Sequence, residues 1–355
     1  MPGAAQSIFS TTRLRADLYS VSEKMRAEVC VITFTERGNQ SLDGPGFGTD
    51  FLLSQGCDVI AVKNLRDDWY AGLTPEHVSL VRMAAARHAI RATYGSSMGA
   101  FAAIRFAKDL DASRVLAISP ILDVRQDWDT RYRHDLPEMI RVGYDTQDPM
   151  IAPDHVDAQI AYQIAYDPYC REDKQQAALL RSLVRRCDAL EVPFGGHPVG
   201  PALRDAALLS KFAASALKLG KVAQIDVSAM QDTPWVRHAR VRYLLERQKL
   251  KSALVVSKHA LEQSPQWSEA QLVHAQILER LGEVDEAIPF AEEAIRLEPK
   301  SPYFVAIVAE FLEKHGRCEL ASQLVREGLG RIGKVDILVS AAQRLDRART
   351  RQGPA

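Results

Sequence analysis

The sequence is poor in cysteine and has no arrangement of cysteines typical of a disulfide framework or a metal site. Its 355 residues contain five cysteines, an odd number, scattered along the chain. No two of them form the C-x-x-C pair that zinc and redox sites use. We therefore expect buried or chemically idle thiols, with no metal and no other cofactor. The five are Cys30, Cys57, Cys170, Cys187 and Cys318.

An excess of charge and a long apolar segment are also missing. Lys plus Arg and Asp plus Glu number 45 each, so no overall field favours nucleic acid or an acidic membrane surface. The first twenty residues have no apolar signal core, and no stretch approaches the roughly 20 apolar residues of a membrane span. We expect a cytoplasmic protein without a nucleic-acid partner. Its 46% hydrophobic residues are enough for a sizeable core.

From residue 28 onward, short apolar and β-branched runs alternate with segments of helical composition. Runs of this kind are typical of parallel strands buried on both faces. The alternation predicts an α/β fold class, a doubly wound and mainly parallel sheet within residues 1–220, with ligands bound at the carboxyl ends of the strands. Residues 1–27 have too weak a pattern to assign. The expected strands are 29–35, 57–63, 88–94, 113–119, 159–166 and 189–194.

A G-x-S-x-G motif, Gly95-Ser96-Ser97-Met98-Gly99, lies between one of these strands and the helical run 100–107. In a nucleophile elbow the serine occupies a strained strand-to-helix turn, and the helix directs its N-terminal amides at the reaction centre. Strand and helix approach closely there, so the flanking residues have to be small. The motif predicts such an elbow at Ser97. The alternative is a glycine-bounded turn with a chance serine.

A serine hydroxyl becomes a good nucleophile when an imidazole takes its proton and a carboxylate orients that imidazole. Asp167 follows the fifth predicted strand, and His197 follows the sixth in a glycine-rich loop. We therefore predict a triad of Ser97, Asp167 and His197, in the order serine, acid, histidine. Asp173 lies close to Asp167, and Asp123 follows an earlier strand, so both remain alternative acids.

Residues 28–218 resemble the α/β-hydrolase superfamily through Gly95-Ser96-Ser97-Met98-Gly99, Tyr166-Asp167-Pro168 and Gly195-Gly196-His197. The resemblance implies a serine hydrolase whose oxyanion hole uses the amide of Met98 and a second amide from the loop 35–38. That second donor would be Glu36 or Arg37, although this loop departs from the common His-Gly pattern. Several bacterial members with such elbows are linked to surface polysaccharide or glycoprotein handling, which makes an acylated carbohydrate a candidate substrate.

The connection 121–158 is long for a link between two strands and is rich in Asp, Arg and aromatic residues, Trp128, Tyr132 and Tyr144 among them. Long connections of this kind are often lids or substrate-selecting segments. Irregular surface packing is the alternative interpretation of the same stretch.

After a predicted linker at 221–232, an internal repeat of 34 residues replaces the strand pattern. This period, with small residues where paired helices touch, is typical of tetratricopeptide repeats. We expect an all-α domain over 233–348, with a capping helix at 334–348 and a disordered tail at 349–355. The repeats would bind a protein partner, mediate self-association or pack against the first domain. Residues recurring at this period include Pro265 and Pro299, Gly282 and Gly316, and Ala253, Ala287 and Ala321.

Two classes of function fit these patterns. The first is a serine hydrolase or esterase that uses the triad on a small-molecule or carbohydrate ester, or an acyltransferase that uses the same triad. A thioesterase or peptidase would differ only in the shape of its pocket. The second is a catalytically idle scaffold whose repeats bind a partner protein. A hydrogen bond between His197 and Ser97 is expected for the enzyme.

Overall fold

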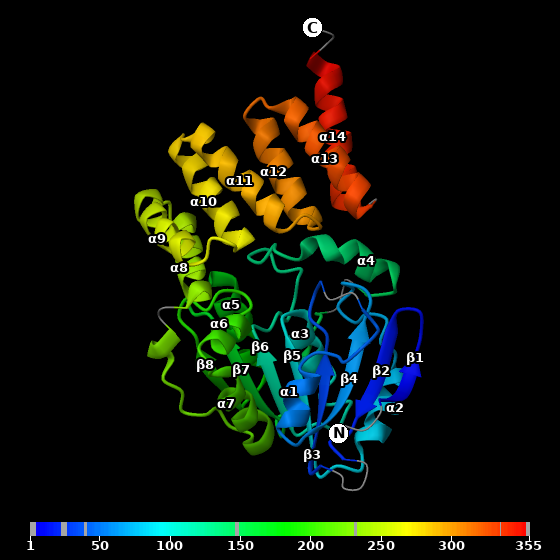
Figure 1. The fold of residues 1–355 in the computed structure, drawn as a ribbon. Helices are drawn as coiled ribbons and strands as arrows, with labels where there is room; N and C mark the ends of the chain where they lie inside the picture. The colour runs from blue at the N-terminus through cyan, green and yellow to red at the C-terminus, as the bar shows by residue number, and fades with distance from the viewer. Residues whose placement is uncertain are drawn as a thin grey trace. The chain divides into compact units, whose positions relative to one another are not determined.

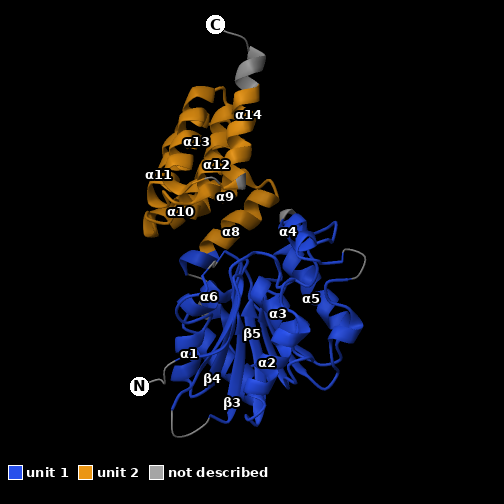
Figure 2. Ribbon diagram, turned by 90° about the vertical axis from the view of Figure 1, so that its right-hand side faces the viewer, with its two compact units in different colours: residues 1–236 blue, residues 237–355 orange. Residues whose placement is uncertain are grey.

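The computed structural model describes residues 5–22, 27–38, 41–145, 149–230, 233–333 and 335–352. The chain divides into two compact units, Met1–Val236 and Arg237–Ala355 (Figure 2). The described part of the predicted linker, residues 221–230, belongs to the first unit.

The first unit contains an eight-stranded, mainly parallel sheet in the order β1-β2-β4-β3-β5-β6-β7-β8 (Figure 1). All neighbours from β4 to β8 pair in parallel, and β2 pairs antiparallel with β1 and β4. The sheet confirms the predicted fold class. The strands are β1 Gln6–Ser10, β2 Leu14–Tyr19, β3 Val29–Phe34, β4 Asp58–Asn64, β5 Ile90–Ser96, β6 Arg114–Ile118, β7 Ala161–Tyr166 and β8 Cys187–Glu191.

Helices cover both faces of the sheet, as an α/β fold requires. Every residue of β3 and β4 is buried, because these strands are covered from both sides. One apolar cluster includes buried residues of α2, α3 and α5, and a second includes those of α1, α6 and α7. The helices are α1 Thr49–Ser54, α2 Pro75–Ala85, α3 Met98–Arg105, α4 Leu136–Arg141, α5 Arg171–Leu183, α6 Gly200–Asp205 and α7 Leu209–Ala214.

The C-terminal region consists of successive helices, which confirms the predicted all-α domain. The alanines that recur at 34 residues, Ala253, Ala287 and Ala321, are each fully buried, because small side chains are needed where paired helices touch. None of the helices in the described ranges has both the length and the apolar character that crossing a membrane requires. The helices are α8 Pro234–Glu246, α9 Leu250–Gln263, α10 Ser268–Leu281, α11 Val284–Leu297, α12 Pro302–Lys314, α13 Cys318–Ile332 and α14 Asp336–Gln352.

The end of this region differs from the sequence prediction in one respect. The helix α14 extends to Gln352, so residues 349–352 continue the predicted capping helix and do not form a disordered tail. The rest of the predicted tail, residues 353–355, lies outside the described residues.

Candidate functional site

The turn between β5 and α3 has the geometry of a nucleophile elbow. Ser97 has φ 51° and ψ −112°, a region that non-glycine residues rarely occupy and that is strained. A Cβ on Gly95 would lie 2.1 Å from the carbonyl carbon and oxygen of Gly99, and a Cβ on Gly99 would lie 2.4 Å from the carbonyl oxygen of Phe34. Both contacts are with backbone atoms, so both positions require glycine.

Ser97 and His197 meet as predicted, and Asp173 completes a continuous chain of hydrogen bonds with them. Ser97 Oγ lies 3.0 Å from His197 Nε2. His197 Nδ1 lies 2.9 Å and 3.0 Å from the two carboxylate oxygens of Asp173. With Nδ1 protonated, the imidazole donates to Asp173 and accepts at Nε2 from the serine hydroxyl. This arrangement allows the imidazole to act as a general base toward the serine.

The predicted contact between Asp167 and His197 is wrong. Asp167 accepts the backbone N–H groups of Tyr169 at 2.8 Å, Phe194 at 3.1 Å and Gly196 at 2.9 Å. Two of these donors belong to the loop that carries His197, so Asp167 fixes that loop and does not contact the imidazole. The other alternative acid, Asp123, forms a bidentate pair with Arg125.

Asp173 is held as a carboxylate by opposite charge. Burial acts to raise its pKa, but His197 and Arg131 outweigh that effect, and its pKa falls below the usual value. Arg131 Nη1 donates to Asp173 at 2.7 Å, and the same guanidinium forms a bidentate pair with Asp129. Gln176 donates to Asp129 at 2.9 Å. His197 and Arg131 therefore both hold the carboxylate of Asp173 in place.

The residues predicted to form the oxyanion hole are positioned beside the elbow. Met98 is the first residue of α3, and its amide lies at the N-terminus of that helix. Glu36 and Arg37 lie in the loop after β3, where the carbonyl oxygen of Phe34 approaches Gly99. The oxyanion role of the Met98, Glu36 and Arg37 amides stays a prediction.

The side chains of Glu36 and Arg37 have different environments. Burial raises the pKa of the Glu36 carboxyl, and the positive charge of Arg204 opposes the shift. The Arg37 guanidinium donates from Nε and Nη2 to the two carboxylate oxygens of Asp135, at 3.0 Å and 2.9 Å. This pair links the loop after β3 to the long connection that follows β6.

That connection contributes two residues to the site that the sequence analysis did not select. Arg131 binds the acid Asp173, and the ring of Tyr132 packs against that of Trp69, with centroids 5.6 Å apart. The Tyr132 ring centroid is also 5.9 Å from that of His197. The only signal in the sequence was the enrichment of the connection in arginine and aromatic residues, which does not distinguish one of them from another.

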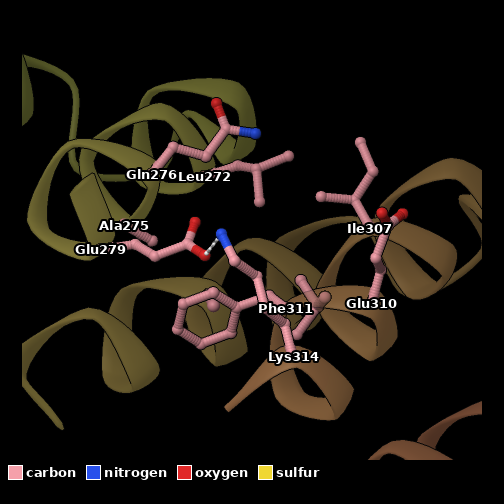
Figure 3. Close-up of a pocket in the computed structure, with 10 residues that line it drawn as sticks. Leu272, Ala275, Gln276, Glu279, Ile307, Glu310, Phe311 and Lys314 are labelled. Atoms are coloured by element: carbon pink, nitrogen blue, oxygen red, sulfur yellow. Dashed lines mark hydrogen bonds and ion pairs between the residues drawn. The ribbon is translucent and has the colours of Figure 1, made fainter. Parts of the chain in front are cut away.

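The helical unit contains a separate pocket of about 280 Å³ between α10 and α12 (Figure 3). Its walls are largely apolar, and an ion pair between Glu279 Oε1 and Lys314 Nζ, at 2.9 Å, joins the two helices. Glu310 is exposed and has no hydrogen-bond or ion-pair partner among the residues that the structure describes. The lining residues are Leu272, Ala275, Gln276, Glu279, Ala291, Ile307, Val308, Glu310, Phe311 and Lys314.

No protein-family model matches the sequence, and neither does any curated protein. Solved structures are similar to parts of the chain at low identity. The capsule O-acetyltransferase of Neisseria meningitidis serogroup A is 13% identical with a TM-score of 0.41, over 52% of this chain and 85% of that chain. Est1E from Butyrivibrio proteoclasticus is 14% identical with a TM-score of 0.42, over 61% of this chain and 99% of that chain.

A thermophilic tetratricopeptide-repeat protein of Thermus thermophilus is similar as well. It is 17% identical with a TM-score of 0.31, over 42% of this chain and 82% of that chain. At these identities and TM-scores, none of the three solved structures indicates what this chain acts on or binds. Its activity has to be inferred from its own residues.

Proposed function

We propose that this chain is a serine hydrolase or acyl-transfer enzyme that acts on an ester. Ser97 is the nucleophile, His197 is the general base, and Asp173 orients the imidazole and stabilises its positive charge. The observation that supports this proposal most strongly is the unbroken series of contacts from Ser97 Oγ to His197 Nε2 and from His197 Nδ1 to Asp173. An idle scaffold has no need for a strained serine hydrogen-bonded to an imidazole.

The chemistry follows from these contacts. His197 takes the hydroxyl proton as Ser97 Oγ attacks the ester carbonyl, and a tetrahedral oxyanion forms. When that intermediate collapses, the bond to the leaving alcohol breaks, and the imidazolium returns its proton to the alcohol oxygen. Water or a second alcohol then attacks the acyl-enzyme, again losing its proton to His197, and Ser97 is regenerated.

The substrate class follows from the resemblance and the chemistry together. A small-molecule or carbohydrate ester fits a serine nucleophile, and an acylated sugar is the candidate that the resemblance implies. Hydrolysis and transfer differ only in which hydroxyl attacks the acyl-enzyme. A thioesterase or a peptidase would use the same residues, so a panel of acyl donors has to include thioesters and amides.

The test is pre-steady-state turnover of p-nitrophenyl acetate by the full chain. We expect a burst of p-nitrophenol close to one equivalent if deacylation is slower than acylation, and an acetyl group on Ser97 in acid-quenched protein by peptide mass. Both should disappear in Ser97→Ala and remain in Ser182→Ala, a matched change at an exposed serine of α5. If the folded protein turns over no acyl donor of the panel and acquires no acyl group from any of them, the result would favour the catalytically idle scaffold.

A second function, binding of a partner protein by the repeats, is favoured by the pocket between α10 and α12. Its apolar walls suit an apolar side chain, and the unpaired carboxylate of Glu310 at its edge suits a neighbouring lysine or arginine. We therefore propose a partner segment that carries an apolar residue next to a basic one. Self-association through the same repeats is the alternative.

Peptide-array selection by the full chain tests this binding function. Peptides with an apolar residue beside Lys or Arg should be enriched, and Glu310→Lys should shift the preference toward Asp or Glu. Glu292→Lys, at an exposed glutamate of α11 outside the pocket, should leave the selection unchanged. Self-association would be favoured by two results together: no peptide is enriched, and sedimentation shows a dimer that Glu310→Lys dissociates.

A further inference from the structure

An arginine of the long connection after β6 shares one carboxylate oxygen with the candidate general base. Arg131 Nη1 donates to Asp173 Oδ1 at 2.7 Å, and His197 Nδ1 lies 2.9 Å from the same oxygen. The two nitrogens cannot lie further apart than these two distances combined. That separation is within the range of about 4–6 Å over which a charge shifts the titration of a neighbouring group by about 1–3 units.

The guanidinium of Arg131 is fixed in this place by a second carboxylate. Its Nε and Nη2 donate to the two carboxylate oxygens of Asp129 at 2.9 Å and 2.8 Å. Asp129 is buried, and Gln176, on the same helix α5 as Asp173, donates to it at 2.9 Å. Gln176 also accepts the backbone N–H of Leu122 at 2.8 Å. The guanidinium is therefore held between two buried carboxylates, one on the connection and one on α5, and such support keeps a site residue in a single geometry.

The charges of Arg131 and Asp129 act on the imidazole in opposite directions. Burial acts to lower the pKa of the Arg131 guanidinium, but Asp129 and Asp173 outweigh that effect, and the guanidinium stays charged. A fixed cation disfavours a second positive charge on the nearby imidazole, whereas the carboxylate of Asp129 favours it. The other titratable or charged groups around this cluster are Tyr132 of the connection, Arg37 of the loop after β3, Cys170 before α5 and Asp167 after β7.

We propose that Arg131 is a positioning residue that holds the acid Asp173 and determines the lower pH limit at which His197 acts as a base. With the guanidinium in place, protonation of the imidazole is less favourable than it is beside Asp173 alone. The neutral base therefore persists to lower pH. Asp129 fixes the guanidinium and offsets part of its charge. The connection after β6 thereby acts on the chemistry through the acid, a role that rests on the proposed serine-nucleophile function.

The test is the pH dependence of kcat/KM of the full chain with p-nitrophenyl acetate, because this profile reports the titration of the free enzyme. Arg131→Gln removes the positive charge and should move the acidic midpoint up by about one unit, since Asp129 offsets part of the usual effect. Asp129→Asn removes the opposing charge and should move the midpoint down. Arg131→Lys keeps the charge but loses the bidentate pair, so its midpoint should match the wild type while its plateau falls. The control is Arg133→Gln, at an exposed arginine that pairs with Asp127, which should leave the profile unchanged.

The outcomes separate this inference from the function on which it rests. A midpoint does not depend on the amount of folded enzyme, so a partly unfolded variant still reports the effect of the charge. Unchanged midpoints would overturn the role of Arg131, and so would shifts of Arg131→Gln and Asp129→Asn in the same direction, which a general loosening of the site would cause. An equal shift in Arg131→Lys would also overturn it. If Arg131→Gln gives no folded enzyme, the direction of the Asp129→Asn shift decides. A wild-type chain that turns over no ester would overturn the proposed function itself.

Discussion

Replacing Asp173 with asparagine should abolish most of the activity, whereas the same change at Asp167 should not. Asp173 is fully buried, and its carboxylate lies 2.9 Å from His197 Nδ1. At an effective dielectric constant of about 20, a unit charge pair at that distance interacts by about 6 kcal/mol. Each 1.36 kcal/mol corresponds to tenfold in rate, and Arg131 already offsets part of the negative charge. We therefore expect a loss of about 10³–10⁴-fold in kcat/KM, in line with the triad template.

The control substitution is Asp167→Asn. The amide keeps one oxygen as acceptor for the N–H groups of Tyr169 and Phe194 but loses the acceptor for Gly196. One hydrogen bond is worth about 0.5–1.5 kcal/mol, so the rate should fall by roughly tenfold or less as the loop of His197 loosens.

The assay is initial-rate turnover of p-nitrophenyl acetate, normalised to folded enzyme by circular dichroism. Asp173→Asn leaves part of the charge of Arg131 unpaired, and breaking a buried pair costs about 3–5 kcal/mol, so the rates should be measured well below the melting temperature. A larger loss for Asp167→Asn than for Asp173→Asn would refute the assignment of the acid.

Two further predictions concern the elbow and the repeats. Gly99→Ala places a Cβ against the carbonyl oxygen of Phe34 and should lower both the melting temperature and the yield of active enzyme. The control is Gly330→Ala, at a helical position where nothing lies within 4 Å of the added Cβ. It should preserve activity and raise the free energy of unfolding by up to about 1 kcal/mol. Burial, with a smaller contribution from Lys258, lowers the pKa of His274 to about 4. Below pH 6.5 the unfolded state then binds more protons, so the helical unit should lose about 3 kcal/mol of stability between pH 6.5 and about 4. Protection factors of the α10 amides, which correct hydrogen exchange for its intrinsic pH dependence, should report this loss, and His274→Gln should reduce it. Protection factors that stay constant between pH 6.5 and about 4 would contradict the reasoning.

Much of the fold could be predicted because its signals are local. Buried strands need continuous apolar runs, and paired helices need small residues at a fixed period, so both patterns appear directly in the sequence. The hairpin of β1 and β2 escaped prediction because β1 lies at the sheet edge and is half-exposed. Such a strand does not need an apolar run.

The candidate site could be predicted only in part. The requirement for glycine at Gly95 and Gly99 follows from close approach of the backbone, and the structure has those contacts. The predicted contact of Asp167 with His197 is wrong because Asp167, which directly follows β7, accepts backbone N–H groups of a turn, a role that aspartate before proline often takes. Asp173, in the first turn of α5, contacts His197 only through the tertiary fold. The positions of Arg131 and Tyr132 likewise depend on long-range contacts that leave no periodic pattern.

The measurement that tests the central claim most directly is fluorophosphonate labelling of the full chain, followed by intact mass and peptide mapping. An activated serine should give one adduct, located on Ser97, absent in Ser97→Ala and formed much more slowly in His197→Ala. A folded chain that gains no adduct, or gains it on Ser96 or Ser119 instead, would contradict the account.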